Sequence, residues 1–566
     1  MLTQPRKSPA DDPLELLSLA RREIATGLRS PPPRERSRGP VHVNVTILLR
    51  GALRASTSGR APTLREATAD GARRAAHDAR FGPMLSIAEL DDATVELWVQ
   101  RSRLPLSPRA ALESLDLGAD GVDLECDGAR AYYKPSVPLT LGVTSRELLL
   151  RRLSRKARLA PDAWARPGAR LHRTTWDMYL EHSGLPEGVV RLHRLRPLGD
   201  APATRDELLD RLDLATDRLV TSQRASGLFL YRYHPFTGRV ARDNARLVRQ
   251  AGCAYAVAAA AEAETDPVWH EELRASARDA VAALRAFESR THAGTLCFER
   301  DGPEPAPLGA VALVLLALQF AGLRGELGPL AGELVRTILG AQAADGCFRC
   351  DLQRPGAQPG SPGQNFYPGE ALLALTYEAE RGDAACAEAI ARALPWYRRH
   401  FRRAPSPAFV LWQVDAWRRA EALAGAGAVD LDAGELRRFV FELVDWILPF
   451  QQGAPSDFAG GFAVNGRPPG FSTSLYAEAA IRAFELARRH GDEPRSERYR
   501  KAALRGLSFL MRLQIVEEMT PLFRAPELAL GATTSSLDDF TIRCDFDQHT
   551  ITAFLAACEA DSLLPD

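Results

Sequence analysis

The 566-residue sequence lacks the features that would place it in a membrane or a secretory route. No stretch reaches the roughly 20 apolar residues that a membrane-spanning helix needs, and the longest, residues 308–322, is typical of a buried helix. The first residues lack the apolar core of a signal peptide. Cysteine is sparse, and most of the eight cysteines stand singly within apolar runs, which indicates a reducing compartment. We therefore expect a cytoplasmic protein with no membrane partner.

An excess of charge of either sign is also missing. The 72 basic and 72 acidic residues balance, which argues against a basic surface for nucleic acid. Only four of the basic residues are lysines, namely Lys7, Lys134, Lys156 and Lys501. Together with the abundant alanine, we interpret the preference for arginine as codon bias of a GC-rich genome, without functional meaning.

Motifs for cofactors are absent as well. The sequence has no phosphate-binding loop, no G-x-G-x-x-G after a strand and no G-x-S-x-G. Cys347 and Cys350 form a C-x-x-C, but a zinc site usually needs a second pair at matching spacing. We predict neither a metal ion nor a cofactor.

The amino-terminal third alternates between strand and helix patterns. Helical spacing of apolar residues predicts helices over 14–28, 63–76 and 145–156. Strands are predicted over 41–49, 95–100, 122–126 and 129–133, the last two joined by the turn Asp127-Gly128. We predict a disordered segment over 1–11, an α+β domain over 12–185 and a linker over 186–204.

Several phrases of this domain resemble the AMMECR family in their order. They are LELLSLARREI, GALRAS, AAHDARFGPM, AELDDATVELWV and LLRRLSRKARLAPDAW, spread over residues 12–182. The family usually carries Leu-Arg-Gly-Cys-Ile-Gly, whereas this chain keeps Leu53 and Arg54 and has Ser56 in place of the Cys. Its Leu-Pro-Gln-Val segment reads Lys134-Pro135-Ser136-Val137 here. The resemblance therefore implies an altered or inactive copy if that Cys is chemically important.

The rest of the chain repeats one helix pair six times. A polar amphipathic helix is followed by a Gly-rich turn and then by a helix that is apolar on most of its circumference. The amphipathic helices are predicted over 205–223, 269–288, 326–342, 383–401, 432–452 and 495–514. The apolar helices begin near Arg249, Leu308, Pro368, Phe409, Thr473 and Asp547. We predict a multidomain protein, an α+β domain followed by an all-α (α/α)6 toroid over 205–566, with an open solenoid as the alternative.

This pattern resembles the six-hairpin glycosidase-like superfamily of (α/α)6 toroids, which also contains sugar epimerases and uronic acid lyases. The phrases that carry the resemblance are RQAGCAYAVA, NFYPGEALLALTYE, FELVDWILPFQ, STSLYAEAAIRAF and RCDFDQHTITAFL. The resemblance implies that catalytic acids lie at the starts of the inner helices and in the loops that line the funnel.

Two glutamates are candidate acids. Glu370 follows Tyr367-Pro368-Gly369 at the start of the third apolar helix, where a carboxylate could act in catalysis or only complement the helix dipole. Glu478 lies in an Ala-rich helix, where a carboxylate is costly unless a cavity or a pair with Arg482 compensates it.

The last apolar helix begins with a cluster of ionisable residues. Asp545 and His549 lie four residues apart and could form an acid–imidazole pair that prepares the histidine for proton transfer. The remaining residues are candidates for binding the substrate through arginine, amide and aromatic groups: Asp243, Arg246, Arg249, Tyr231, Gln364, Asn365, Tyr367 and Arg543.

The leading hypothesis is a carbohydrate-active enzyme of the glycoside hydrolase, epimerase or lyase type that acts through carboxylates on a small-molecule or glycan substrate. One alternative is a non-catalytic binding or scaffold protein, in which the acids only cap and pack. A third is a cyclase or transferase on an apolar substrate. The sequence leaves the substrate and the oligomeric state open.

Overall fold

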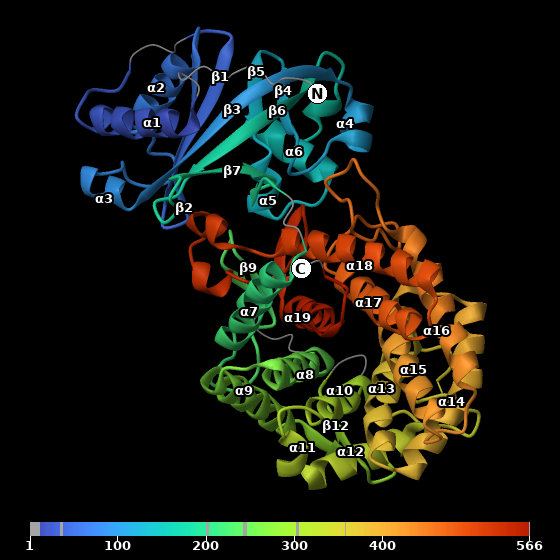
Figure 1. Cartoon of the computed structure of the whole chain (residues 1–566). Helices are drawn as coiled ribbons and strands as arrows, with labels where there is room; N and C mark the ends of the chain where they lie inside the picture. Colours follow the sequence, from blue (N-terminus) through green and yellow to red (C-terminus); the bar gives the residue numbers. More distant parts are fainter. Residues whose placement is uncertain are drawn as a thin grey trace.

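The computed structural model describes residues 12–33, 38–199, 203–241, 246–301, 305–356 and 358–564, so the predicted disordered segment 1–11 lies outside the described residues. Figure 1 shows an α/β body at the amino-terminal end of the chain and, beneath it, a ring of helices. Within the described residues no helix is both long and apolar enough to cross a bilayer.

The amino-terminal body is built on one antiparallel sheet with the strand order β2-β1-β3-β6-β4-β5, and β7 also pairs with β6. Its strands are β1 (Val41–Leu49), β2 (Ala52–Ala61), β3 (Ala93–Leu106), β4 (Gly121–Cys126), β5 (Ala129–Tyr133), β6 (Arg170–Glu181), β7 (Val189–His193) and β8 (Arg196–Pro197). Its helices are α1 (Pro13–Leu28), α2 (Leu64–Ala75), α3 (Ile87–Asp91), α4 (Pro108–Ser114), α5 (Ser136–Leu141) and α6 (Arg146–Lys156). The predicted helices and strands are all present.

The two faces of this sheet differ. On β1 the pleat turns Val43, Val45 and Ile47 into the apolar core beneath α1 and α2. The alternate residues His42, Asn44 and Thr46 form a buried polar row on the other face.

The prediction of a linker over residues 186–204 is wrong for most of the described residues in this range, which form strands. Strand β7 pairs with β6, and β8 pairs with β7, so the sheet extends to residue 197. Val190 and Leu192 alternate with polar residues and are buried, which gives this short segment a core-facing side.

The remaining chain forms a closed ring of two layers. The outer helices are α7 (Arg205–Thr221), α9 (Pro267–Arg285), α12 (Gly328–Ala341), α14 (Ala384–Arg403), α16 (Ala433–Ile447) and α18 (Glu493–Leu513). The inner helices are α8 (Leu247–Ala263), α10 (Leu308–Ala317), α13 (Tyr367–Glu380), α15 (Val410–Gly425), α17 (Thr473–Arg489) and α19 (Cys544–Glu559). Each inner helix contacts the next, and α19 contacts α8, so the ring closes as predicted and the open solenoid is excluded.

Four glutamines at the ends of outer helices tie neighbouring units together. The side-chain amide of each donates to a backbone carbonyl in the next outer helix, at 2.8–2.9 Å. The pairs are Gln223 with Ser276, Gln342 with Ala389, Gln451 with Ala502 and Gln514 with Arg211. The last pair joins α18 to α7 and so connects the end of the ring to its beginning.

A glycine turn accompanies each of these glutamines. At Gly531, where φ is +79°, a Cβ would lie 1.9 Å from the carbonyl oxygen of Leu214 in α7. At Gly346, where φ is +94°, a Cβ would lie 2.2 Å from the carbonyl oxygen of Arg392 in α14. Only glycine fits both the left-handed backbone and this close approach, which explains the recurring Gln–Gly phrase.

The α/β body packs on the loops of the last and first units of the ring. Arg196 of β8 is buried in the ring, where it donates to the carbonyl oxygens of Arg512 and Leu513 at the end of α18 and to Thr534. A shared apolar cluster surrounds this contact and includes Trp98 and Met178 of the α/β body and Phe523 and Phe540 of the ring. The two bodies are therefore held by both apolar and polar contacts.

We predict that Gln514→Ala destabilises the ring by about 1–3 kcal/mol, because it removes the side-chain amide that donates to the carbonyl groups of Arg211 and Gly531. Denaturant unfolding of the intact chain, followed by circular dichroism, measures the change. Gln452→Ala is the matched control, since that amide bonds only within its own loop, to Phe450. An equal loss of stability in both variants would contradict the assigned role of Gln514.

Candidate active site

All six inner helices begin at the same end of the ring, because each is entered from the loop that follows an outer helix. The candidate residues of the first helical turns therefore gather at one mouth. The α/β body lies beside this mouth, since it contacts the loop segments around Asp457 and residues 515–540.

Glu370 occupies the first turn of α13 and is only 4% exposed. Its Oε2 has no hydrogen-bond partner and lies against Gly309 of α10, where a Cβ would stand 2.2 Å from it. Burial raises the pKa of Glu370 to about 8. The side chain is therefore a neutral acid at pH 7 that retains its proton for transfer.

Glu478, in α17, is equally buried and accepts a hydrogen bond of 2.8 Å from the hydroxyl of Thr552 in α19. Burial raises the pKa of Glu478 to about 7, and the positive charge of Arg482 opposes that rise. The predicted alternative, an ion pair between Glu478 and Arg482, does not form. The Arg482 guanidinium instead pairs with Glu559 and Glu485.

Asp545 is held between two arginines. Its carboxylate accepts two hydrogen bonds from Arg543 and lies 3.2 Å from Nε of Arg249 in α8. Arg249 also donates to the hydroxyl of Tyr231. This corrects the predicted Asp545–His549 pair, because both carboxylate oxygens of Asp545 face arginine.

His549 lies one turn further along α19. Its Nδ1 accepts from the amide of Gln548 at 3.2 Å, which leaves the ring proton on Nε2. Burial lowers the pKa of His549 to about 4, so the imidazole is neutral at pH 7. Its ring centroid is 5.9 Å from that of Trp412 in α15, and Trp412 in turn lies 6.2 Å from Tyr255 in α8.

Other predicted binding residues lie away from this group. Gln364 is fully buried and bonds the carbonyl of Phe348 and the hydroxyl of Tyr397. Asn365 faces His400 of the outer helix α14. Arg246 is exposed before α8, and Asp243 lies outside the described residues. Tyr367 does lie at the mouth, in contact with Gly309 beside Glu370.

Aromatic residues complete the inner wall. Phe471 stacks on Phe546 with centroids 3.7 Å apart, and the guanidinium of Arg543 lies over the Phe546 ring. Tyr255 and Thr552 were not predicted as site residues. The signal for Tyr255 was a single aromatic residue in the Ala-rich middle of α8, whereas Thr552 becomes recognisable only through its contact with Glu478.

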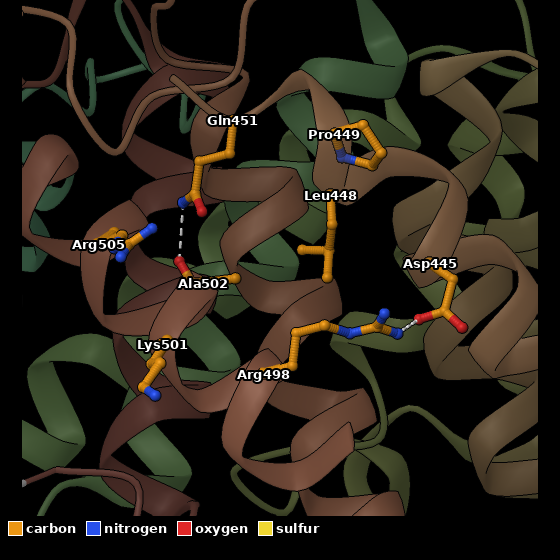
Figure 2. A pocket seen from close by; sticks show the side chains of 8 residues that line it. All are labelled: Asp445, Leu448, Pro449, Gln451, Arg498, Lys501, Ala502 and Arg505. Carbon is orange, nitrogen blue, oxygen red and sulfur yellow. Dashed lines mark hydrogen bonds and ion pairs between the residues drawn. The ribbon is translucent and has the colours of Figure 1, made fainter. Parts of the chain in front are cut away.

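Two hollows on the outer surface contain none of these residues. One lies between α16 and α18 and is lined by Asp445, Arg498, Lys501 and Arg505, with Arg498 paired to Asp445 (Figure 2). The other lies between α7 and α9, beside Asp213 and Trp269. Across the described part of the chain, no three His, Cys, Asp or Glu side chains gather closely enough to hold a metal ion.

Comparison with known proteins finds a family model that matches most of the α/β body. Residues 17–178 match the model of the AMMECR1 family. A protein of Thermococcus gammatolerans is 34% identical over 129 residues, which make up 22% of this chain. The chain spans 61% of the length of that relative.

The ring is similar in fold to solved structures of carbohydrate-active enzymes. A D-mannose isomerase is 14% identical, with 62% of this chain and 98% of that chain covered and a TM-score of 0.46. An α-1,6-mannanase of Salegentibacter sp. is 9% identical, with 63% and 100% covered and a TM-score of 0.43.

We predict that Glu370→Gln stabilises the protein in a pH-dependent manner. The folded state holds the Glu370 proton up to about pH 8, whereas an unfolded glutamate loses it near pH 4.5. The wild type therefore loses stability as the pH rises from about 4.5 through about 8, and the variant does not. We expect a gain of about 4 kcal/mol at pH 8 and less than about 0.5 kcal/mol at pH 4.5.

Melting temperatures of both proteins across this pH range provide the measurement. Glu380→Gln, on the exposed end of the same helix, is the control and should show no comparable gain. A variant that is less stable than the wild type at pH 8 would show that Glu370 is ionised and paired.

Proposed function

We propose that the ring is a sugar-converting enzyme of the isomerase or epimerase type, in which Glu370 and Glu478 exchange protons with a sugar bound in the lumen. The observation that carries this proposal is the pair of buried carboxyl groups on two inner helices. Among the described contacts neither forms an ion pair, and both titrate close to neutral pH. A general acid or base works best when its pKa lies near the working pH.

The two carboxyl groups suit opposite roles. At pH 7 Glu370 is protonated and can donate to the carbonyl oxygen of an open-chain sugar. Glu478 is partly ionised at this pH and can accept the proton from the neighbouring carbon. The product is an enediol, which becomes a ketose or an epimer according to the carbon and the face that regain the proton.

Other side chains of the inner helices suit this chemistry. Negative charge develops on the sugar oxygen as the carbon loses its proton, and the guanidinium of Arg249 and the Nε2 proton of His549 can stabilise that charge. Trp412 and Tyr255 offer apolar ring faces on which the C–H face of a sugar can stack.

The contacts of Asp545 favour this proposal over glycoside hydrolysis. A glycosidase needs a carboxylate that is free to attack the sugar or to activate water. Asp545 is the third candidate acid at the mouth, but Arg543 and Arg249 engage it. The same double pairing is the observation that favours the second candidate function, a non-catalytic scaffold in which the mouth residues only hold the ring together.

An isotope experiment distinguishes these functions. The wild type is incubated in D2O with a panel of aldoses, and NMR follows deuterium at C2 of the aldose or its epimer and at C1 of a ketose product. We expect deuterium incorporation that Glu370→Gln or Glu478→Gln reduces by about 10²- to 10⁴-fold. Glu380→Gln should retain it. Release of reducing ends from oligosaccharides without deuterium uptake would point to hydrolysis, and the absence of both reactions would favour the scaffold.

The pH dependence of kcat/KM provides a further prediction. The base Glu478 must be ionised, so activity rises through about pH 7, and the acid Glu370 must be protonated, so activity falls above about pH 8. We therefore expect a narrow maximum between these values. The residual activity of Glu370→Gln should lose the alkaline limb and keep the acidic one, and an unchanged profile in that variant would contradict the assignment.

A further inference from the structure

The hydroxyl group of Thr552 links the inner helices α19 and α17. Its Oγ1 lies 2.8 Å from Oε2 of Glu478 and 3.2 Å from the backbone carbonyl oxygen of His549, one turn earlier in α19. Glu478 and Thr552 are only 4% and 5% exposed, so bulk water has little access to this contact. Among the described residues, Thr552 is the hydrogen-bond partner that holds the Glu478 carboxyl group.

A threonine hydroxyl group can serve either protonation state of a carboxyl group, because it has one hydrogen to donate and two lone pairs that accept. When Glu478 is ionised, Thr552 donates to the carboxylate. When Glu478 is protonated, its O–H can donate to Oγ1 of Thr552, and the Thr552 hydrogen can turn to the carbonyl oxygen of His549. The contact is therefore satisfied in both states.

An arginine partner could not serve both states. The guanidinium group has five donors and no acceptor, so it matches an ionised carboxylate and offers nothing to the O–H of a protonated one. Asp545 has two such partners, Arg543 and Arg249. Glu478 has a hydroxyl partner instead, which is the arrangement that suits a group that must take up and release a proton in every catalytic cycle.

Charged groups on three inner helices act on Glu478 without pairing with it. They are Arg482 on α17, Asp415 on α15 and Glu559 on α19. Burial has the largest effect and raises the pKa of Glu478, Arg482 lowers it, and the two acids raise it. Tyr255 of α8 faces the same group and stays neutral, because burial raises its pKa well above the usual range. Among the described contacts none of these groups bonds to Thr552, so a substitution there leaves their charges in place.

We propose that Thr552 is the positioning residue of Glu478, and that its hydroxyl group turns between the carboxyl group and the His549 carbonyl oxygen as Glu478 loses and regains its proton. This inference rests on the proton-transfer role proposed above for Glu478. The proton taken from the sugar carbon stays on Glu478 until it is returned, and the Thr552 hydrogen changes its acceptor without leaving its oxygen. The carboxyl group is thereby held in one place through the whole cycle.

The pH profile of Thr552→Val tests the proposal in the full chain. The hydrogen bond to the ionised carboxylate is stronger than the bond to the protonated form, so its loss moves the ionisation of Glu478 to higher pH. We expect the acidic limb of the kcat/KM profile to move up by about one to two pH units. The alkaline limb, which we assign to Glu370, should stay in place.

Two further variants separate this role from a structural one. Thr552→Ser keeps the hydroxyl group and should restore the profile of the wild type. Thr550→Val is the matched control, because it removes a buried hydroxyl group from the same helix that bonds to Thr533 and not to Glu478. It should move neither limb. An acidic limb that stays in place in Thr552→Val, or that moves equally in Thr550→Val, would overturn the inference.

Melting temperatures provide a measurement that needs no activity. The wild type loses stability as the pH rises from about 4.5 through about 7, because Glu478 keeps its proton up to about pH 7 in the folded state. In Thr552→Val this loss should continue to higher pH, so the gap to the wild type widens between about pH 6 and about pH 9. In a Glu478→Gln background the same substitution should cost an equal amount at every pH.

The two measurements distinguish the failure of this inference from the failure of the proposed function. A gap that stays constant with pH in the presence of Glu478 would overturn the role of Thr552, even in an active enzyme. A gap that widens only in the presence of Glu478, in a protein that turns over no sugar, would support the role of Thr552 and count against the proposed function alone.

Discussion

The ring depends on a hydrogen bond between a glutamine amide and a backbone carbonyl of the next outer helix. Three of these contacts join neighbouring units, and the fourth, from Gln514 to Arg211, closes a circle across about 300 residues of chain. A repeat array whose last unit does not contact its first stays open, with two ends that each need a polar cap. Closure instead directs all six inner helices toward a common centre. Residues as distant as Arg249 and Asp545 then meet at one mouth.

Closure also determines the electrostatics of the lumen. The inner helices are rich in alanine and leucine, so a carboxyl group among them has little water to stabilise its charge. Two arginines hold Asp545, whereas Oε2 of Glu370 has no hydrogen-bond partner and burial keeps this acid protonated at pH 7. An acid that costs stability when it ionises is typical of a functional position rather than a structural one.

The sequence predicted the architecture better than the contacts within it. The helix pairs and three of the four Gln–Gly phrases are local patterns, but Gln514 and Gly531 are separated by a 16-residue insertion that hides the fourth. Strands β2 and β6 were missed because their residues are mostly polar, as in LRASTSGRA.

Glu370 and Glu478 were recognisable as carboxylates in Ala-rich helices. The spacing of Asp545 and His549 suggested that they form a pair. In the structure Arg249 binds the Asp545 carboxylate instead. Arg249 lies nearly 300 residues earlier in the chain, and local spacing carries no information on such a distant partner.

The α/β body completes the mouth of the ring from outside. Strand β14 (Asp539–Arg543) leads directly into α19 and pairs with β9 (Arg232–His234), so its position sets that of Arg543. Phe540 of the same strand packs in the cluster shared with the α/β body and lies under the guanidinium of Arg196. Arg196 also donates a hydrogen bond to the carbonyl oxygen of Leu513 at the end of α18, directly before Gln514. The contact between the bodies therefore supports both the closure of the ring and the arginine that holds Asp545, which gives a physical reason for joining these two folds in one chain.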